Sequence, residues 1–221
     1  MPVMGHASAT APLLTLAALA IGLLLGFLLR RQTCIAASKG EALVANEIEA
    51  KFRQLHVLIN NITLPTPDGT SQIDHILVCR AGVYVIETKH YQGWIFGEAG
   101  QSRWMHVLYR RKSQFQNPLR QNQGHVRALK SCLKMPGVPI TSLVVFTGTA
   151  KFQTPRDPAV LLLNELIPRL LQSQPSALDE TQMAGIVGRI EMARRRRSLE
   201  TDEYHLSFVR SRMKAYRYRG R

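Results

Sequence analysis

Residues 72–93, "QIDHILVCRAGVYVIETKHYQG", constrain the fold most, because they form two apolar runs separated by a short turn near Arg80–Gly82. Apolar runs on either side of a glycine-containing turn are typical of a β-hairpin. Three charged residues, Asp74, Glu87 and Lys89, lie within these runs. Side chains alternate between the two faces of a strand, so Glu87 and Lys89 share a face. The sequence predicts a largely apolar hairpin that carries three charges in its strands.

A tight turn places Asp74 almost opposite Glu87 on the neighbouring strand. Two carboxylates in this position repel each other, and a divalent cation between them removes the repulsion, since hard oxygen ligands suit Mg²⁺ or Mn²⁺. Lys89 would then approach a scissile phosphate, so the spacing suits metal-assisted hydrolysis of phosphodiester bonds. The alternative is a hairpin whose charges face solvent, because Glu-x-Lys is a common ion pair worth ~0–1 kcal/mol when exposed.

A third carboxylate belongs to a predicted helix in "SKGEALVANEIEAKFRQL". Apolar residues recur there at helical spacing, and Ser38 and Gly40 suit a helix start. Glu41 lies on the same stripe as Val44 and Ile48, so it points in the direction of the buried face. Glu41 is therefore a candidate to join the metal ligands directly or through water.

Turn residues and apolar periodicity indicate the elements that follow. We expect a strand in "HVLINNITLP", a second hairpin within 94–109, a helix in "NPLRQNQGHVRALKSCLK" and a buried strand in "ITSLVVFTG". The order of helix, strands, helix and strand predicts an α/β or α+β fold, with a mixed sheet flanked by helices, over about residues 40–150.

Two more helices are expected beyond this unit. One opens at Asp157-Pro158 and is kinked or ended by Pro168. The other opens near Ser176, with Asp179 at capping-box spacing. These helices form a predicted extension that ends in an arginine-rich run.

Residues 11–29 form an uncharged stretch of nineteen residues, long enough to cross the hydrocarbon core of a bilayer. A signal peptide and a buried helix of a water-soluble domain are the alternatives. No Lys or Arg precedes the stretch, whereas Arg30, Arg31 and Lys39 follow it. The positive-inside rule therefore predicts a single-pass anchor with the remainder of the chain in the cytoplasm. The layout of anchor plus domain favours a bacterial inner membrane.

Positive charge is concentrated in two segments of a chain whose net charge is +14. Residues 103–134 contain eight basic residues and no carboxylate, and residues 189–221 contain eleven basic against four acidic residues. Such segments favour nucleic acid or acidic lipid headgroups as partners, although basic runs also serve solubility or membrane orientation. The residues that we expect to contact nucleic-acid phosphates are Arg110, Arg111, Lys112, Arg120 and Arg127.

Aromatic and cysteine residues add two smaller constraints. Trp94, Trp104, Tyr109 and Phe115 either stack on unpaired bases or pack the second hairpin, and packing is the more common role. Three cysteines at no metal-ligand spacing give no support to a disulfide framework or a zinc site.

The ordered segments "KGEALV", "LPTPDGTSQIDHILVCRAGVYVIETKHYQGWIFG" and "FQNPLRQN", followed by a helix and "VVF", resemble the nuclease-related domain (NERD) family. The resemblance covers about residues 38–150 and implies a fold of the PD-(D/E)xK nuclease-like type. It also implies roles for individual residues. Glu41 would be the helix acid, Asp74 and Glu87 the metal ligands, Lys89 the catalytic lysine and Gln121 a polar residue beside the site.

The resemblance covers a nuclease-related domain (38–150), and the segments outside it are an anchor (1–37), a helical extension (151–198) and a basic tail (199–221). The resemblance and the anchor together predict a membrane-anchored, Mg²⁺- or Mn²⁺-dependent nuclease that cuts DNA at the cytoplasmic face. A fold does not fix a function. A nuclease-like module that binds DNA or a partner protein at the membrane without cutting is therefore the alternative.

Overall fold

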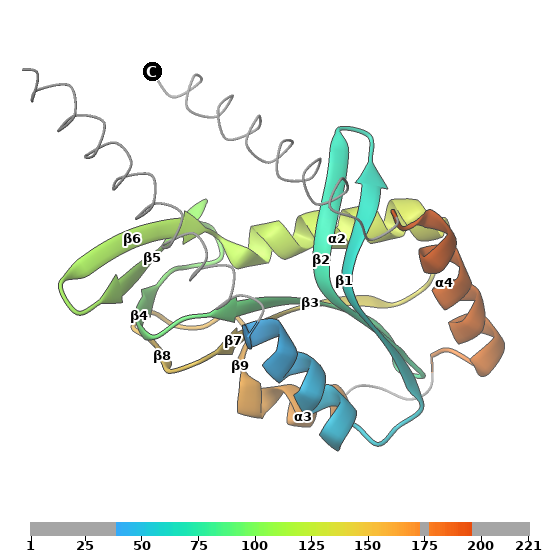
Figure 1. Cartoon of the computed structure of the whole chain (residues 1–221), viewed down its shortest axis with the longest axis horizontal. Coiled ribbons are helices and arrows are strands. Elements are labelled where there is room, and N and C mark those ends of the chain that lie inside the picture. The colour runs from blue at the N-terminus through green and yellow to red at the C-terminus, as the bar shows by residue number, and fades with distance from the viewer. Residues whose placement is uncertain (1–38, 173–176, 196–221) are drawn as a thin grey trace, which may run out of the picture. The chain divides into compact units, whose positions relative to one another are not determined.

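The structure, a computed structural model, describes residues 39–172 and 177–195, whose arrangement is shown in Figure 1. The predicted membrane span 11–29 and the basic tail 199–221 lie outside the described residues. Among the residues described, no helix is long and apolar enough to cross a membrane. The first described element is a helix over residues 39–51.

A mixed five-stranded sheet forms the centre of the fold, in the order β1-β2-β3-β7-β9. β1, β2 and β3 pair antiparallel, whereas β7 pairs parallel to both β3 and β9. A parallel pair needs a crossover connection, and the chain between β3 and β7 supplies one. The strands are β1 (His56–Thr66), β2 (Gly69–Cys79), β3 (Gly82–His90), β7 (Ile140–Thr147) and β9 (Val160–Leu162).

The predicted hairpin is confirmed as β2 and β3, which pair from Cys79 opposite Gly82 upward. The turn between them is the dipeptide Arg80-Ala81. Gly82 has φ +135°, and a Cβ at this position would lie 2.8 Å from the carbonyl oxygen of Pro139. Only glycine therefore fits here without strain, which fixes where β3 begins.

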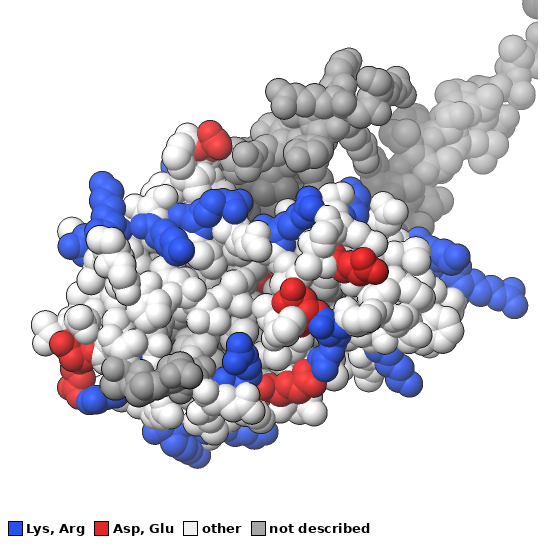
Figure 2. Space-filling model, turned by 180° about the vertical axis from the view of Figure 1, so that it is seen from behind, with Lys and Arg blue, Asp and Glu red and all other residues white. Residues whose placement is uncertain are grey.

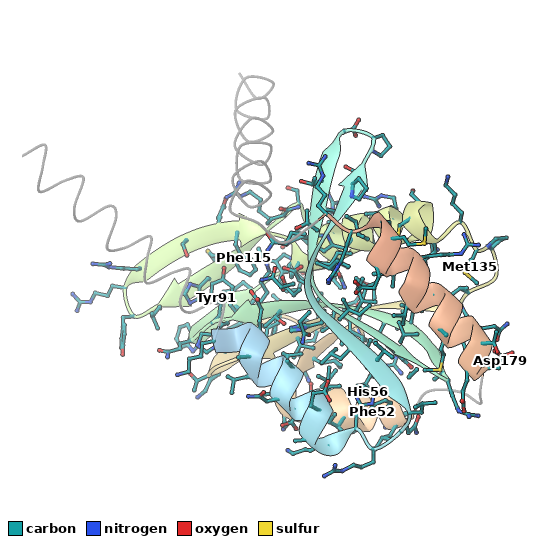
Figure 3. All side chains as sticks on the ribbon, turned by 45° about the vertical axis from the view of Figure 1, so that its right-hand side comes forward. Phe52, His56, Tyr91, Phe115, Met135 and Asp179 are labelled. Atoms are coloured by element: carbon teal, nitrogen blue, oxygen red, sulfur yellow. The ribbon has the colours of Figure 1, made fainter. Side chains whose placement is uncertain are left out.

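A second, four-stranded sheet lies beside the first, in the order β6-β5-β4-β8 (Figure 1). The predicted hairpin within 94–109 is confirmed as β4 and β5, which pair antiparallel, while the short strands β6 and β8 were not predicted. One face of this sheet is buried, and there the rings of Tyr91 and Phe115 lie 4.8 Å apart (Figure 3). The strands are β4 (Gly93–Phe96), β5 (Arg103–Leu108), β6 (Arg111–Gln116) and β8 (Ala150–Phe152).

Helices cover both faces of the five-stranded sheet, as the sequence predicts. On one face, α2 (Pro118–Leu133) and α4 (Glu180–Ala193) bury Leu129, Met183 and Ile186 against β1, β2 and β3. On the other face, the helix 39–51 and α3 (Leu163–Leu171) bury their apolar residues against β2, β3 and β7. The region after residue 150 therefore contributes to the same apolar core as the strands.

The two C-terminal helices begin later than the sequence predicts. The prediction that a helix opens at Asp157-Pro158 is wrong, because β9 pairs with β7 there and α3 begins at Leu163. The Asp157 carboxylate instead accepts a hydrogen bond from the Ala159 amide at 2.8 Å, which makes a turn. Pro168 lies inside α3 without ending it.

Helix α4 begins at Glu180, and Asp179 is its N-cap. The Asp179 carboxylate accepts from the Gln182 amide at 2.7 Å, and the Gln182 side chain accepts from the Asp179 amide at 2.9 Å. This reciprocal pair is a capping box in which Asp179 is the cap, not the third residue of the helix. The predicted start, Ser176, lies outside the described residues.

Candidate functional site

Asp74 and Glu87 occupy adjacent positions on β2 and β3. The pairing of His75 with Ile86 places Asp74 across from Glu87 when the register is continued by one residue. The Asp74 Oδ2 atom accepts a hydrogen bond from the Thr88 amide at 2.8 Å. The Glu87 side chain is only 2% exposed. The structure therefore brings the two predicted carboxylates together at the pair of central strands.

Lys89 lies one pleat further along β3 and contacts two of the predicted site residues. Its Nζ atom donates to Glu87 Oε1 at 2.6 Å and to Gln121 Oε1 at 3.1 Å. The Lys89 side chain is 19% exposed, so the cluster does not enclose it completely. Glu87, Lys89 and Gln121 thus form one hydrogen-bonded cluster built from β3 and α2.

His125 belongs to the same cluster, although we did not predict it from the sequence. Its Nε2 atom lies 3.1 Å from Glu87 Oε2, and its Nδ1 atom lies 2.7 Å from the Ser71 hydroxyl. A carboxylate only accepts, so Nε2 carries the hydrogen, and in the neutral ring Nδ1 then accepts from the hydroxyl. The spacing in the sequence could have indicated His125 as a member of the cluster, because it follows Gln121 by one helical turn and lies on the same helix face.

Two asparagines fix α2 in the position that this cluster needs. Asn117 caps the helix by accepting from the Leu119 amide at 2.9 Å. Asn122 is fully buried, and its amide nitrogen lies 2.8 Å from the carbonyl oxygens of both Val85 and Leu143. These hydrogen bonds join α2 to β3 and β7, and they fix the positions of Gln121 and His125 relative to β3.

Glu41 enters the site through the close packing of its neighbour Gly40. A Cβ on Gly40 would lie 2.9 Å from both His90 Cβ and Thr147 Oγ1. Glycine at position 40 therefore lets the helix lie closer to the ends of β3 and β7 than a residue with a side chain would. The charge on Glu41 acts on Asp74 and helps to raise its pKa. The structure therefore brings the third predicted carboxylate within electrostatic reach of the other two.

The electrostatics of the site differ between its two central carboxylates. Burial raises the pKa of Asp74 well above its ordinary value, and the negative charges of Glu87 and Glu41 add to this effect. Burial acts in the same direction on Glu87, but Lys89 and His125 outweigh it and hold the pKa of Glu87 below its usual value. Glu87 is therefore a stable anion, whereas Asp74 carries the unfavourable charge of the cluster.

Lys89 is held in its charged form. Burial alone would lower the pKa of this ammonium group, but the adjacent Glu87 carboxylate outweighs burial and raises it. An ammonium group in this state acts as a fixed positive charge rather than as a base.

Comparisons with known proteins identify the family. The sequence profile of the nuclease-related domain family matches residues 36–147, just over half of the chain. The chain belongs to the NERD family. An uncharacterised protein of Bacillus anthracis is 38% identical over 108 residues, which cover 48% of this chain and 50% of that protein. The chain thus spans about half the length of this curated relative. No solved structure gives a significant match.

The NERD domain places donor atoms of the right kind for a hard divalent cation at Glu41, Asp74 and Glu87. Burial is the largest cause of the raised pKa of Asp74, and the charges of Glu87 and Glu41 add to it. Both oxygens of Glu87 have partners, namely Lys89 and His125. Within residues 39–172 and 177–195, no three His, Cys, Asp or Glu side chains are arranged as a ready metal cluster.

The predicted phosphate-binding residues lie on the surface of the NERD domain. Arg110, Arg111 and Lys112 are exposed at the turn and start of β6, and Arg120 and Arg127 are exposed on α2. Figure 2 shows lysine and arginine side chains spread over several parts of one face of the molecule, with carboxylates between them. The charge on this face therefore does not form a single uniform patch.

Proposed function

We propose that this NERD protein is a membrane-anchored, metal-dependent nuclease that hydrolyses phosphodiester bonds of DNA at the cytoplasmic face of a bacterial inner membrane. The observation that carries the proposal is the contact of Lys89 with both Glu87 and Gln121, next to Asp74. The apolar stretch 11–29, followed by arginines, supports the anchor and the orientation.

In this proposal Asp74 and Glu87 hold the cation, and Glu41 completes the acidic set. A Mg²⁺ or Mn²⁺ ion, when bound, would polarise the phosphoryl oxygen and lower the pKa of water. Hydrolysis forms a bond from the water oxygen to phosphorus and breaks one phosphodiester P–O bond, leaving a phosphate monoester and a hydroxyl. The protein must therefore stabilise negative charge on the phosphoryl oxygens in the transition state.

Lys89 supplies that positive charge in the proposed reaction. Its raised pKa keeps the ammonium group protonated at neutral pH, and its partial exposure leaves it accessible to a substrate. Gln121 orients the ammonium group, while His125, itself bonded to the Ser71 hydroxyl, donates to the other oxygen of Glu87. Lys89 must release part of its contact with Glu87 when a phosphate approaches.

A cleavage assay tests the proposal directly. The full-length chain in detergent is incubated with supercoiled, linear and branched DNA in Mg²⁺, Mn²⁺ or EDTA. Asp74→Ala and Lys89→Ala should each lower metal-dependent cleavage by about 100-fold or more, whereas Arg53→Ala, which removes an exposed positive charge elsewhere, should cut as wild type does. Absence of metal-dependent cleavage, or equal cleavage by Asp74→Ala, would contradict the proposal.

One observation favours the alternative, a module that binds DNA or a partner protein without cutting. Both oxygens of Glu87 are engaged by Lys89 and His125, as in an ion-pair network with a structural role. DNA binding by the wild type with no cleavage of any substrate would support this alternative. Retained binding with lost cleavage in Asp74→Ala would exclude it.

The membrane part of the proposal has its own test. A reporter that is active only outside the cytoplasm is fused after Arg221, and activity of this fusion would reverse the proposed orientation. In the proposed orientation, with the C-terminus in the cytoplasm, acidic lipid headgroups are a second proposed partner, and the basic tail 199–221 would bind them.

A further inference from the structure

The four-stranded sheet buries one face and exposes the other. The buried face packs Ile95, Trp104 and Phe146 into one apolar cluster. Trp104 is 2% exposed, whereas Trp94, one residue before Ile95 on β4, is 52% exposed. Because neighbouring residues on a strand point to opposite faces, Trp94 lies on the outer face of the sheet. A large aromatic ring is thus presented to solvent in the middle of the sheet.

A row of four side chains crosses this outer face. The pairing register places Lys151 of β8 beside Trp94 of β4, then Val107 of β5, then Lys112 of β6. Both lysines are exposed. Neighbouring residues in register project to the same side of a sheet. The ring of Trp94 is therefore flanked along one row by a positive charge at each end.

The composition of the sheet strengthens this arrangement. Its four strands contain no Asp or Glu. Gln114 and Gln116 follow Lys112 at even spacing on β6, and Arg103 of β5 pairs with Gln116, so all three lie on the same side as Lys112, and all are exposed. The outer face thus offers cations for phosphates, amides for the edges of bases and the exposed ring of Trp94, beside the half-buried side chains of Phe96, Met105 and Val107.

We infer that the outer face of this sheet binds single-stranded nucleic acid, with Trp94 stacking on an unpaired base and Lys112 and Lys151 contacting the flanking phosphates. Base stacking on an aromatic side chain tolerates any sequence, and it requires a base that is not already stacked in a duplex. Four-stranded sheets that bind RNA in this way stack two or three bases. As a statement about substrate form, this inference rests on the proposed function, whereas the binding itself does not.

An anionic membrane surface is the competing partner for a tryptophan among lysines. The outer face of the sheet favours nucleic acid, because Trp94, 52% exposed, is the one exposed large apolar side chain on the described strands β4, β5, β6 and β8. Exposed amides such as Gln114 and Gln116 suit the polar edges of bases better than a lipid interface.

Tryptophan fluorescence gives a direct test, because the chain contains only two tryptophans and Trp104 is buried. The full-length chain in detergent and EDTA is titrated with oligo(dT), oligo(U), a duplex of the same length, and vesicles containing phosphatidylserine. Single strands should quench the emission of the wild type and leave Trp94→Phe almost unquenched. Trp94→Ala should bind single strands about 5- to 100-fold more weakly, as expected for one lost stacking contact.

A matched pair of charge variants separates this face from overall charge. Lys112→Gln with Lys151→Gln should reduce the slope of log affinity against log salt by about 1.4, since each phosphate contact to a single strand contributes about 0.7. Lys130→Gln with Lys134→Gln removes two exposed charges at the end of α2 and should leave the slope unchanged. Equal effects of the two pairs would overturn the assignment.

Three further outcomes would overturn the inference: equal quenching of Trp94→Phe, equal affinity for the duplex, and quenching by vesicles but not by oligonucleotides. The titration in EDTA is independent of cleavage. A chain that quenches with single strands but never cuts would contradict only the proposed nuclease function. A chain that cuts DNA without quenching of Trp94 would contradict only the inference about this face.

Discussion

His125 Nε2 lies 3.1 Å from Glu87 Oε2, in a contact that joins α2 to the middle of β3. Glu87 is an almost fully buried anion, so each of its hydrogen bonds offsets a large cost of desolvation. The histidine is in turn held by the Ser71 hydroxyl of β2. This contact therefore links three elements around one carboxylate.

Replacing His125 by alanine should lower the free energy of unfolding by about 1–3 kcal/mol, because Glu87 Oε2 would lose its buried donor. His125→Gln retains one donor and one acceptor and should recover part of the loss. Arg127→Ala, on the exposed face of the same helix, should change stability by less than about 0.5 kcal/mol. Urea unfolding measures the free energy of unfolding of all three variants. A His125→Ala variant as stable as Arg127→Ala would show that the contact between His125 and Glu87 does not stabilise the fold.

The sequence predicted that Asp74 and Glu87 lie side by side because the hairpin fixes its own register. The two-residue turn at Arg80-Ala81 leaves one pairing of β2 with β3, and that pairing places Asp74 opposite Glu87. The helix stripe likewise predicted the direction of Glu41. His125 was missed because a lone histidine on a helix carries no signal until the strand beneath it is known. Only the folded structure shows that His125 lies beside Glu87, on the same helix face as Gln121.

The fold was predicted less well where strands are short. β8 has three residues and β9 has three, too few for a periodic pattern to stand out. β9 gains its stability by pairing with β7, so local sequence around Asp157-Pro158 indicated a helix start where long-range pairing produced a strand. The aromatic residues divide in the same way. Trp104 packs inside, and Trp94 one strand away does not, although both lie in similar apolar segments.

Asp74→Asn should stabilise the protein in metal-free buffer at pH 8. The folded-state pKa of Asp74 is raised, so above that pKa the ionised carboxylate destabilises the fold, and asparagine removes the charge while its carbonyl oxygen still accepts from the Thr88 amide. The free energy of unfolding should rise by on the order of 1 kcal/mol, as is typical when a residue kept for function is replaced by one that suits the fold better. Glu98→Gln, an exposed carboxyl, should show no gain.

Adding Mg²⁺ or Mn²⁺ should reverse this order. A cation bound only by the folded state stabilises it by about 2.7 kcal/mol at one hundred times its Kd. The wild type should gain this stability and Asp74→Asn should not. Thermal unfolding with and without the cation measures the effect, and equal gains in both proteins would place the cation elsewhere.

His75 should make the protein sensitive to mild acid. Burial lowers its pKa from 6.5 to about 4, and its ring nitrogens lie near Asn60 Oδ1 and Thr88 Oγ1. The unfolded state binds a proton below pH 6.5 and the folded state does not until about pH 4, so stability falls as the pH is lowered through this window. The slope is about 1.4 kcal/mol per pH unit for one proton.

Comparison with His75→Gln isolates this effect. The titration of Asp74 changes the stability in the opposite direction, but it does so equally in the wild type and in His75→Gln, so it cancels in the difference. The raised pKa of Asp74 makes the folded state take up a proton first, which adds stability as the pH falls. The wild type should therefore lose stability relative to His75→Gln between pH 6.5 and 4, by about 3 kcal/mol at most. A constant difference across this range would show that His75 remains accessible to protons in the folded state.

Gly40→Ala should destabilise the protein, although alanine is the better helix former. The helix would gain about 1 kcal/mol from propensity. The new Cβ would lie 2.9 Å from His90 Cβ and Thr147 Oγ1, and relieving such contacts in a packed interface costs about 1–3 kcal/mol. The helix 39–51 must then move away from β3, which carries Glu41 away from Asp74.

Gly185→Ala is the matched control, because a Cβ on Gly185 of α4 has no atom within 4 Å. This variant should raise the free energy of unfolding by about 0.5–1 kcal/mol through propensity alone. Opposite signs of the two alanine substitutions in urea unfolding would establish that Gly40 sets the distance between the helix and the strands. If Gly40→Ala is stabilised as much as Gly185→Ala, the close approach is not required, and the position of Glu41 in the site depends on other contacts.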